Sequence, residues 1–240
     1  MSLLRSMLYT AILFCSVIPA SIAIVLARLF GYRASYWVNS LWTRSTVWLC
    51  KVICGLDYAV EGRHNIPDTA SVVFLKHSST YETIVQVVMF PRQTWVLKRE
   101  LMWTPFVGWA LLPLRAIAID RGAHRAAVQQ VIEQGKQRLA DGICVMIFPE
   151  GTRMKAGHTR PYGISGTLLA QESGCLLVPV AHNAGDFWPR RGLRKRPGTV
   201  QFCIGPPVDP SGRDPREVNA ELQNWVETKV AELRQSSGDA

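Results

Sequence analysis

The sequence predicts an α/β fold in which a largely parallel sheet is flanked by helices. From Leu56 onward, short apolar runs alternate with helical stretches, which is the pattern of successive βαβ units. The 240 residues suffice for one domain of ordinary size with an appendage. The stretch before Leu56 differs in kind, because it begins with an uncharged apolar segment. We therefore predict a membrane-associated helical segment over residues 1–56 and an α/β domain over residues 57–240.

Two helices are predicted in the N-terminal segment. Residues 7–27 carry no charge and are long enough to enter or cross a bilayer, for which about 20 apolar residues suffice. A cleaved signal peptide ending at Ser21-Ile22-Ala23 is the alternative, although the apolar run exceeds the usual length of such peptides. More basic residues follow this run than precede it, so we expect the rest of the chain to face the cytoplasm at a bacterial-type inner membrane. Residues 35–56 predict an amphipathic helix at the membrane surface, or alternatively a core helix of the domain.

The strands predicted in the domain are short apolar runs bounded by turn-forming residues. They cover residues 58–60, 71–76, 94–97, 116–119, 143–148, 177–181 and 199–204. The predicted helices cover residues 79–90, 123–141, 162–174 and 215–235. The second of these places Ala127, Val131 and Leu139 near one face, and the last follows Asp214-Pro215, which suits a helix start. Ligand sites of such sheets form where strands end and helices begin.

The composition indicates an anionic partner. The net charge is +9 and the isoelectric point is near 9.5, which favours an anionic lipid surface or an acidic carrier protein. Nucleic acid is disfavoured, because the chain has no zinc-finger spacing, no aromatic RNA-binding motif and no basic heptad pattern. The six cysteines are scattered without a CxxC pair, so we expect buried reduced thiols rather than disulfides. No cysteine–histidine cluster has ligand spacing, and we expect no metal site.

The first candidate for chemistry is His77, which follows the apolar run 72–75 and precedes Glu82 by five positions. Residues five apart in a continuous helix do not face each other, so a contact requires His77 to lie before the helix. Glu82 would then fix the imidazole tautomer and leave the other ring nitrogen basic. In the alternative interpretation, Glu82 only completes a capping box with Ser79, and His77 is an ordinary polar residue.

A second group of candidates lies in the hexapeptide Phe148-Pro-Glu-Gly-Thr-Arg153, which also follows an apolar run. Gly151 allows close approach of the backbone to a ligand, and Arg153 offers a forked donor for phosphate oxygens. We expect Glu150 either to orient Arg153 or to bind a substrate hydroxyl. The alternative is a tight turn with a surface ion pair.

Further cations follow other predicted strands. Lys98 and Arg121 are each most often solvated when taken singly, but with Arg153 they place three cations at three strand ends of one sheet, which favours a phosphate site. The run over residues 190–196 carries five charges. It predicts either a solvated loop or, beside Phe187 and Trp188, a contact with anionic lipid headgroups. The chain has no GxSxG elbow, P-loop or dinucleotide fingerprint, so a covalent acyl-enzyme is not favoured.

Together these residues resemble the lysophosphatidate acyltransferase family, the 1-acyl-sn-glycerol-3-phosphate acyltransferases. The family's His-x4-Asp motif reads His77…Glu82 here, and its Phe-Pro-Glu-Gly-Thr-Arg motif is matched throughout at residues 148–153. A lysine-led segment from Lys98 to Ile119-Asp120-Arg121 and an apolar run with a central proline at residues 177–180 complete the family order. Glu82 departs from the commoner Asp, and Arg115 stands near a position where the family often has glycine.

The resemblance implies the glycerolipid acyltransferase fold and a mechanism of direct transfer. His77, oriented by Glu82, is expected to deprotonate the sn-2 hydroxyl of lysophosphatidic acid, which then attacks an acyl thioester of coenzyme A or acyl carrier protein to give phosphatidic acid. The expected substrate-binding residues are Lys98, Arg121, Glu150, Gly151, Thr152 and Arg153. No metal or cofactor is implied, because the acyl thioester is a substrate. The alternatives are another lyso-lipid acceptor, such as a lyso-ornithine lipid or another lysophospholipid, and a non-catalytic lipid-binding protein of the same fold.

Overall fold

The computed structural model describes residues 2–123 and 125–238. Within them, seven strands form one sheet in the order β1-β7-β6-β2-β5-β3-β4. Their bounds are β1 Leu56–Glu61, β2 Val72–Leu75, β3 Gln93–Lys98, β4 Ile117–Ile119, β5 Cys144–Ile147, β6 Leu177–His182 and β7 Gly198–Ile204. Neighbours pair in parallel except β6 and β7, so β1 and β7 run opposite to the other five strands. The prediction of a largely parallel α/β sheet is confirmed.

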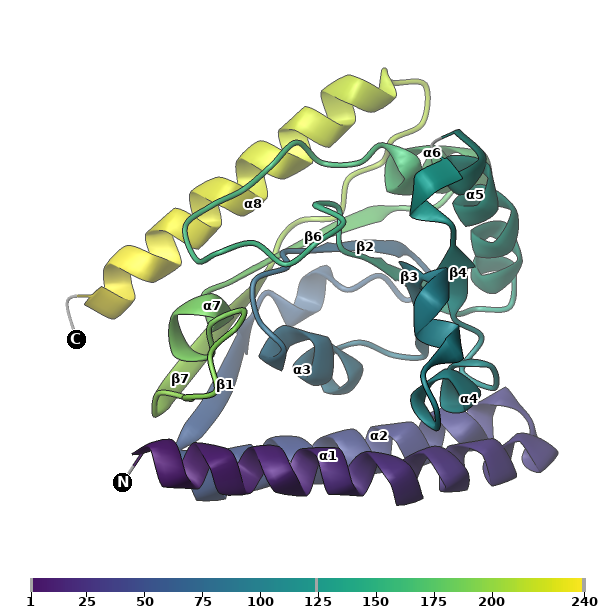
Figure 1. Ribbon diagram of the computed structural model, residues 1–240. Helices are drawn as coiled ribbons and strands as arrows, with labels where there is room; N and C mark the ends of the chain where they lie inside the picture. The colour runs from purple at the N-terminus through teal and green to yellow at the C-terminus, as the bar shows by residue number, and fades with distance from the viewer. Residues whose placement is uncertain (1, 124, 239–240) are drawn as a thin grey trace.

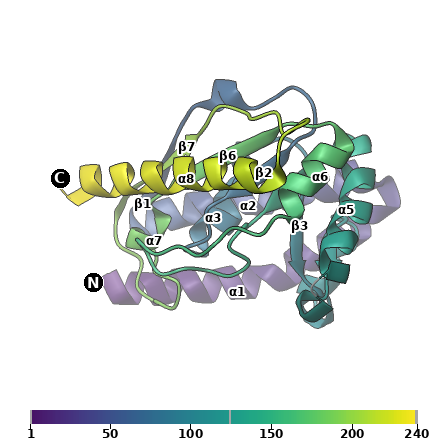
Figure 2. The ribbon, with the colours of Figure 1, turned by 90° about the horizontal axis from the view of Figure 1, so that it is seen from above.

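Helices cover both faces of this sheet (Figure 1). The longer ones are α1 Ser2–Ala27, α2 Tyr32–Cys54, α3 Tyr81–Met89, α5 Arg125–Ala140, α6 Ser165–Ser173 and α8 Pro215–Gly238. Two short helices, α4 Val107–Leu111 and α7 Ala184–Phe187, were not predicted, because four or five residues are too few to show helical periodicity. Figure 2 shows α8 crossing the sheet on the face away from α1 and α2.

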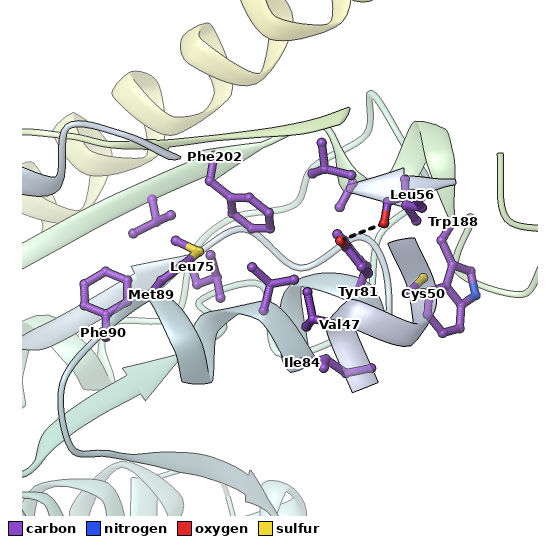
Figure 3. Close-up of a cluster of buried hydrophobic side chains, with 14 of the residues drawn as sticks. Val47, Cys50, Leu56, Leu75, Tyr81, Ile84, Met89, Phe90, Trp188 and Phe202 are labelled. Carbon is purple, nitrogen blue, oxygen red and sulfur yellow. Dashed lines mark hydrogen bonds between the residues drawn. The ribbon is translucent and has the colours of Figure 1, made fainter. Parts of the chain in front are cut away.

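Alternation along the strands creates two hydrophobic clusters. Val72 and Phe74 of β2 face α5, α6 and α8, whereas Val73 and Leu75 face α2 and α3. Figure 3 shows the second cluster, in which Tyr81 lies among apolar side chains and donates from its hydroxyl to the Leu56 carbonyl at 3.4 Å.

The N-terminal helices form a hairpin along one side of the domain (Figure 1). Helix α2 buries Val47, Cys50 and Cys54 in the cluster beneath the sheet, and its other face exposes Trp37 and Trp48. The core-helix interpretation of residues 35–56 therefore describes the buried face of α2, and the surface-helix interpretation describes its exposed face. The division at residue 56 stays a prediction, and the sheet and α2 share one hydrophobic cluster.

Helix α1 is the most apolar of the longer helices. The stretch Ser2–Phe30 contains an 18-residue window with a mean hydropathy of 2.4, and it is long and apolar enough to cross a membrane. It packs against α2 and α4, and it exposes many large apolar side chains, among them Leu4, Phe14 and Leu26. This exposed face is compatible with membrane association.

All six cysteines carry free thiols. Cys15 is exposed, contrary to the expectation that the cysteines are buried, because it lies on α1, where much of the apolar sequence faces outward.

Candidate active site

His77 and Glu82 meet at the turn between β2 and α3. Imidazole Nδ1 lies 2.8 Å from Glu82 Oε1, and the same oxygen accepts from the backbone N–H groups of Ser78 at 3.2 Å and Ser79 at 3.0 Å. His77 lies before the helix, as the contact requires. One buried carboxylate oxygen therefore both orients the imidazole and caps the start of the helix, so the two sequence-based interpretations describe the same contact.

The other ring nitrogen of His77 is available to a ligand. Because Nδ1–H donates to Glu82, the neutral imidazole carries its lone pair on Nε2. The ring stacks on Phe148 with centroids 4.0 Å apart, and the side chain is 13% exposed. Within the described residues, no group is hydrogen-bonded to Nε2. This arrangement suits a general base.

The hexapeptide after β5 wraps around His77. Glu150 Oε2 accepts from the His77 backbone N–H at 2.8 Å, and the Met154 N–H donates to the His77 carbonyl at 2.7 Å. Gly151 allows the tight turn, since its φ of 68° lies in the left-handed region that favours glycine. The two motifs, about 70 residues apart in sequence, thus form one structural unit, in which Thr152 and Arg153 are half-buried.

Glu150 does not occupy the position that the sequence predicts for it. It is 2% exposed and contacts Lys76 and His77, rather than Arg153 or an open substrate site. Burial raises its pKa to about 6, and the nearby Lys76 ammonium opposes the shift. Both carboxylate oxygens of Glu150 accept hydrogen bonds from the protein, so this residue holds the turn at His77 in place from the interior of the domain.

Lys76 is a buried residue that the sequence analysis missed. Its ammonium is 1% exposed and donates to Glu150 Oε1 at 2.7 Å, to Glu227 Oε1 at 2.7 Å and to the His158 carbonyl at 2.9 Å. Glu227 belongs to α8, so this cluster ties the C-terminal helix to the active-site turn. The available signal was a lysine within a predicted strand, directly before His77, which must find carboxylate partners if it is buried.

The three predicted phosphate-binding cations are placed unequally. Arg121 Nη1 donates to the Gly151 carbonyl, which brings the end of β4 against the turn after β5. Arg153 has a buried Nε atom without a partner among the described residues. Lys98 instead pairs with Glu100 at 3.0 Å, and both of these side chains are about half exposed. Arg121 therefore contacts Gly151, Arg153 follows Gly151 by two residues in the same turn, and Lys98 lies at the surface.

Arg115, the departure noted before the Ile119-Asp120-Arg121 turn, forms no part of this group. Its φ of 59° explains why glycine is suited to this position, and its guanidinium pairs with Asp141 at 2.6 Å. The substitution changes the loop and its surface pairing.

An apolar cavity of about 350 Å³ lies between the N-terminal helices and the domain. Its walls come mainly from α1, α2, α3, β3 and α4, with Leu101 and Leu114 from the segments beside α4, and they include Ile24, Trp42 and Val87. Thr83 and Ile84, which directly follow Glu82, line the same cavity. The cavity therefore runs along α3, the helix that carries Glu82. The cavity could not be found from sequence, because its walls come from several elements that are far apart in the chain.

Comparison with known proteins gives consistent results. Residues 57–183 match the family described as Acyltransferase. A Pseudomonas aeruginosa protein named 1-acyl-sn-glycerol-3-phosphate acyltransferase is 40% identical over 235 residues, covering 96% of this chain and 91% of the relative. The mouse 1-acyl-sn-glycerol-3-phosphate acyltransferase alpha is 28% identical over 79% of this chain and 68% of its own length. The crystal structure of the Thermotoga maritima 1-acyl-sn-glycerophosphate acyltransferase, PlsC, has the same fold, with a TM-score of 0.80, 22% identity and coverage of 97% of this chain and 96% of that one.

Proposed function

The chain belongs to the 1-acyl-sn-glycerol-3-phosphate acyltransferase family, and we propose that it acylates the sn-2 hydroxyl of lysophosphatidic acid with His77 as general base. The acyl donor is a thioester of coenzyme A or acyl carrier protein, and the product is phosphatidic acid. The observation that carries the mechanism is the contact between His77 Nδ1 and Glu82 at 2.8 Å, which leaves Nε2 free to accept a proton.

The transfer proceeds in one attack. His77 Nε2 removes the hydroxyl proton while the hydroxyl oxygen attacks the thioester carbonyl carbon. Glu82 stabilises the resulting imidazolium through Nδ1–H. The carbon–sulfur bond then breaks, and the departing thiolate takes the proton from Nε2 to leave as a thiol. General-base assistance of this kind contributes about 10²–10⁴-fold to the rate.

Arg153 and Arg121 hold the acceptor phosphate in this proposal. Among the described residues, the buried Nε–H of Arg153 has no partner. Arg121 donates one N–H to the Gly151 carbonyl and keeps other N–H groups available for a ligand. Gly151 and Thr152 form the turn between the two guanidinium groups. Glu150 acts only through His77 and Lys76, and Lys98 adds a more distant positive charge.

The acyl chains occupy the apolar cavity, which adjoins Glu82 through Thr83. Helix α1 lies along the surface of the inner membrane, with the domain on the cytoplasmic side. The domain contacts α1 both at Ser6, through Lys195, and at Ile24, in the cavity. A spanning α1 would carry this lysine and its neighbouring arginines into hydrocarbon, at a cost of about 2.5–3.5 kcal/mol each.

A transfer assay tests the proposal. Purified wild type, His77→Ala and a matched surface variant, His64→Ala, receive lysophosphatidate or a neutral-headgroup lysophospholipid with acyl-coenzyme A or acyl carrier protein thioester. Wild type and His64→Ala are expected to form phosphatidic acid, whereas His77→Ala loses at least about 100-fold in kcat. If His77→Ala turns over as fast as wild type, the proposed mechanism is wrong. If wild type prefers the neutral-headgroup lysophospholipid, the proposed acceptor is wrong and this lipid class takes its place.

A further inference from the structure

A second group of cations lies beside the active site and has no part in the acceptor site. Five basic side chains surround a cavity of about 510 Å³, here called the basic pocket. They are Lys155, Arg190, Arg191, Arg196 and Arg234. The one acidic residue in its wall, Asp186, pairs with Arg234 at 3.0 Å. The pocket therefore has a strong positive excess.

The basic pocket and the acceptor cations lie on opposite sides of His77. In the sheet, β5, β3 and β4 lie on one side of β2, and β6 and β7 lie on the other. Arg153 and Arg121 follow β5 and β4, whereas three of the pocket arginines lie between β6 and β7. Figure 1 shows the same division, with α7 and β4 on either side of α3. The base is thus placed between two cationic sites.

The basic pocket adjoins the turn that carries His77. Its wall includes Gly185, which packs so closely on Ser78 that an added Cβ would lie 2.9 Å from the Ser78 Oγ. The wall also includes Ala156, two residues beyond the Met154 N–H that donates to the His77 carbonyl. A ligand held here by one end can therefore extend to the base with its other end.

The backbone of the arginine-rich loop is anchored to the rest of the protein, although its arginine side chains are exposed. Lys195 is 1% exposed, donates to the carbonyls of Ser6 at 3.3 Å and Leu193 at 3.1 Å, and lies 4.2 Å from the Trp188 ring centroid. The Arg196 N–H closes the loop by donating to the Phe187 carbonyl at 2.9 Å. Because Lys195 is directed inward as an anchor, the backbone that carries the pocket arginines is held in place, which lowers the cost of ordering this loop around an anion.

We propose that the basic pocket binds the phosphates of a coenzyme A thioester. The inference rests on the proposed acyl transfer and adds the donor and its binding site. Guanidinium groups suit phosphate oxygens, and the cavity volume lies within the range of small-molecule sites, about 300–1,000 Å³. A carrier protein or a membrane would instead press a broad surface against the exposed rim. The concave, multiply cationic cavity matches a compact polyphosphate.

Substitutions on both walls of the pocket test this site. Arg190→Gln and Lys155→Gln change exposed side chains that form no ion pair among the described residues, so the fold is expected to persist. The control is Arg63→Gln, an exposed arginine after β1, which runs opposite to β2 and so places Arg63 at the other edge of the sheet. Each variant is assayed in neutral detergent micelles with palmitoyl-coenzyme A and with palmitoyl-pantetheine, which lacks the phosphates.

We expect the pocket variants to lose activity only with the donor that carries the coenzyme A phosphates. For each pocket variant, kcat/KM falls about tenfold with palmitoyl-coenzyme A, as for one lost charge-assisted contact, and stays within about twofold with palmitoyl-pantetheine. The control leaves both values unchanged. Equal losses with both donors, or no loss with either, would overturn the inference.

Two further assays separate other occupants and the premise itself. A loss confined to acyl carrier protein thioesters would assign the pocket to the carrier, and a loss confined to anionic vesicles would assign it to the membrane; either outcome overturns the coenzyme A site. Absence of lysophosphatidate acylation in wild type with every donor would refute the proposed function, whereas wild-type transfer without a selective loss refutes only the donor site.

Discussion

Replacing Lys76 with methionine tests how the active-site turn is held. The Lys76 ammonium and the Glu150 side chain are 1% and 0% exposed, whereas Glu227 is 23% exposed. The substitution leaves Glu150 in the interior with only the His77 N–H as a partner, while Glu227 retains access to water. The substitution therefore leaves an unpaired buried carboxylate on Glu150, the residue that accepts from the His77 N–H.

The expected cost is about 3 kcal/mol of unfolding free energy, the lower end of the range for breaking a buried ion pair. The lower end applies because the pKa of Glu150 is already raised to about 6 by burial with Lys76 present, so without the ammonium the carboxylate can escape its penalty by binding a proton. In the double variant Lys76→Met/Glu150→Gln, the amide oxygen still accepts from the His77 N–H and no buried charge remains. We expect it to recover about 2 kcal/mol relative to the sum of the single changes.

Urea unfolding in neutral detergent, followed by tryptophan fluorescence, measures these differences, and kcat is determined on the same samples. Lys229→Met is the control, because Lys229 pairs with Glu232 at the surface of α8, and its loss should cost no more than about 0.5 kcal/mol. A cost below about 1 kcal/mol for Lys76→Met, or additive effects in the double variant, would show that the cluster does not hold the turn.

Four further outcomes follow from the site. Glu82→Gln keeps an acceptor oxygen but loses the charge that stabilises imidazolium, so kcat at saturation should fall about 100-fold or more, and an unchanged kcat contradicts the orienting role. Arg153→Ala should raise the KM for lysophosphatidate about tenfold, and an effect on kcat alone would argue against phosphate binding. Ala110→Phe should narrow the apolar cavity and shift the kcat/KM ratio towards short-chain donors, which a chain-length series measures. Burial raises the pKa of Glu150 from 4.5 to about 6, so the protonated carboxyl stabilises the fold below pH 4.5 and this contribution is lost as the pH rises through 6. The unfolding free energy of wild type minus that of Glu150→Gln should therefore decrease by about 2 kcal/mol as the pH rises from below 4.5 to above 6. A difference that does not change with pH contradicts the raised pKa.

The sequence predicts the parts of this fold that depend on local pattern. Strands buried on both faces appear as continuous apolar runs, and each predicted strand overlaps an observed one. The His77–Glu82 contact is also local, because a spacing of five forces the chain to turn if the two residues are to meet. The residues that follow a strand can therefore be identified as candidates before their neighbours are known.

Contacts over long sequence distances escaped prediction. Lys76 meets Glu150 and Glu227 from 74 and 151 positions away, and nothing in the local sequence shows which carboxylate a buried lysine will find. For the same reason Glu150, which lies in a recognised motif, was assigned to substrate although it faces the protein interior. In the run 190–196, the pattern of charges does not show that Lys195 alone is turned inward.

Strand order is the property that turns these local features into an active site. If the strands were ordered as in the sequence, β3 would lie next to β2, and all the cations that follow strands would be spread along one direction. Instead β5 and β6 flank β2, with β3 and β4 beyond β5 and with β7 beyond β6. His77 therefore lies near the middle of the sheet edge, with Arg153 and Arg121 on one side and the basic pocket on the other. In the proposed reaction this arrangement has a direct use, because two separated cationic sites can hold the phosphates of the acceptor and of the donor while the reacting hydroxyl and thioester meet at His77.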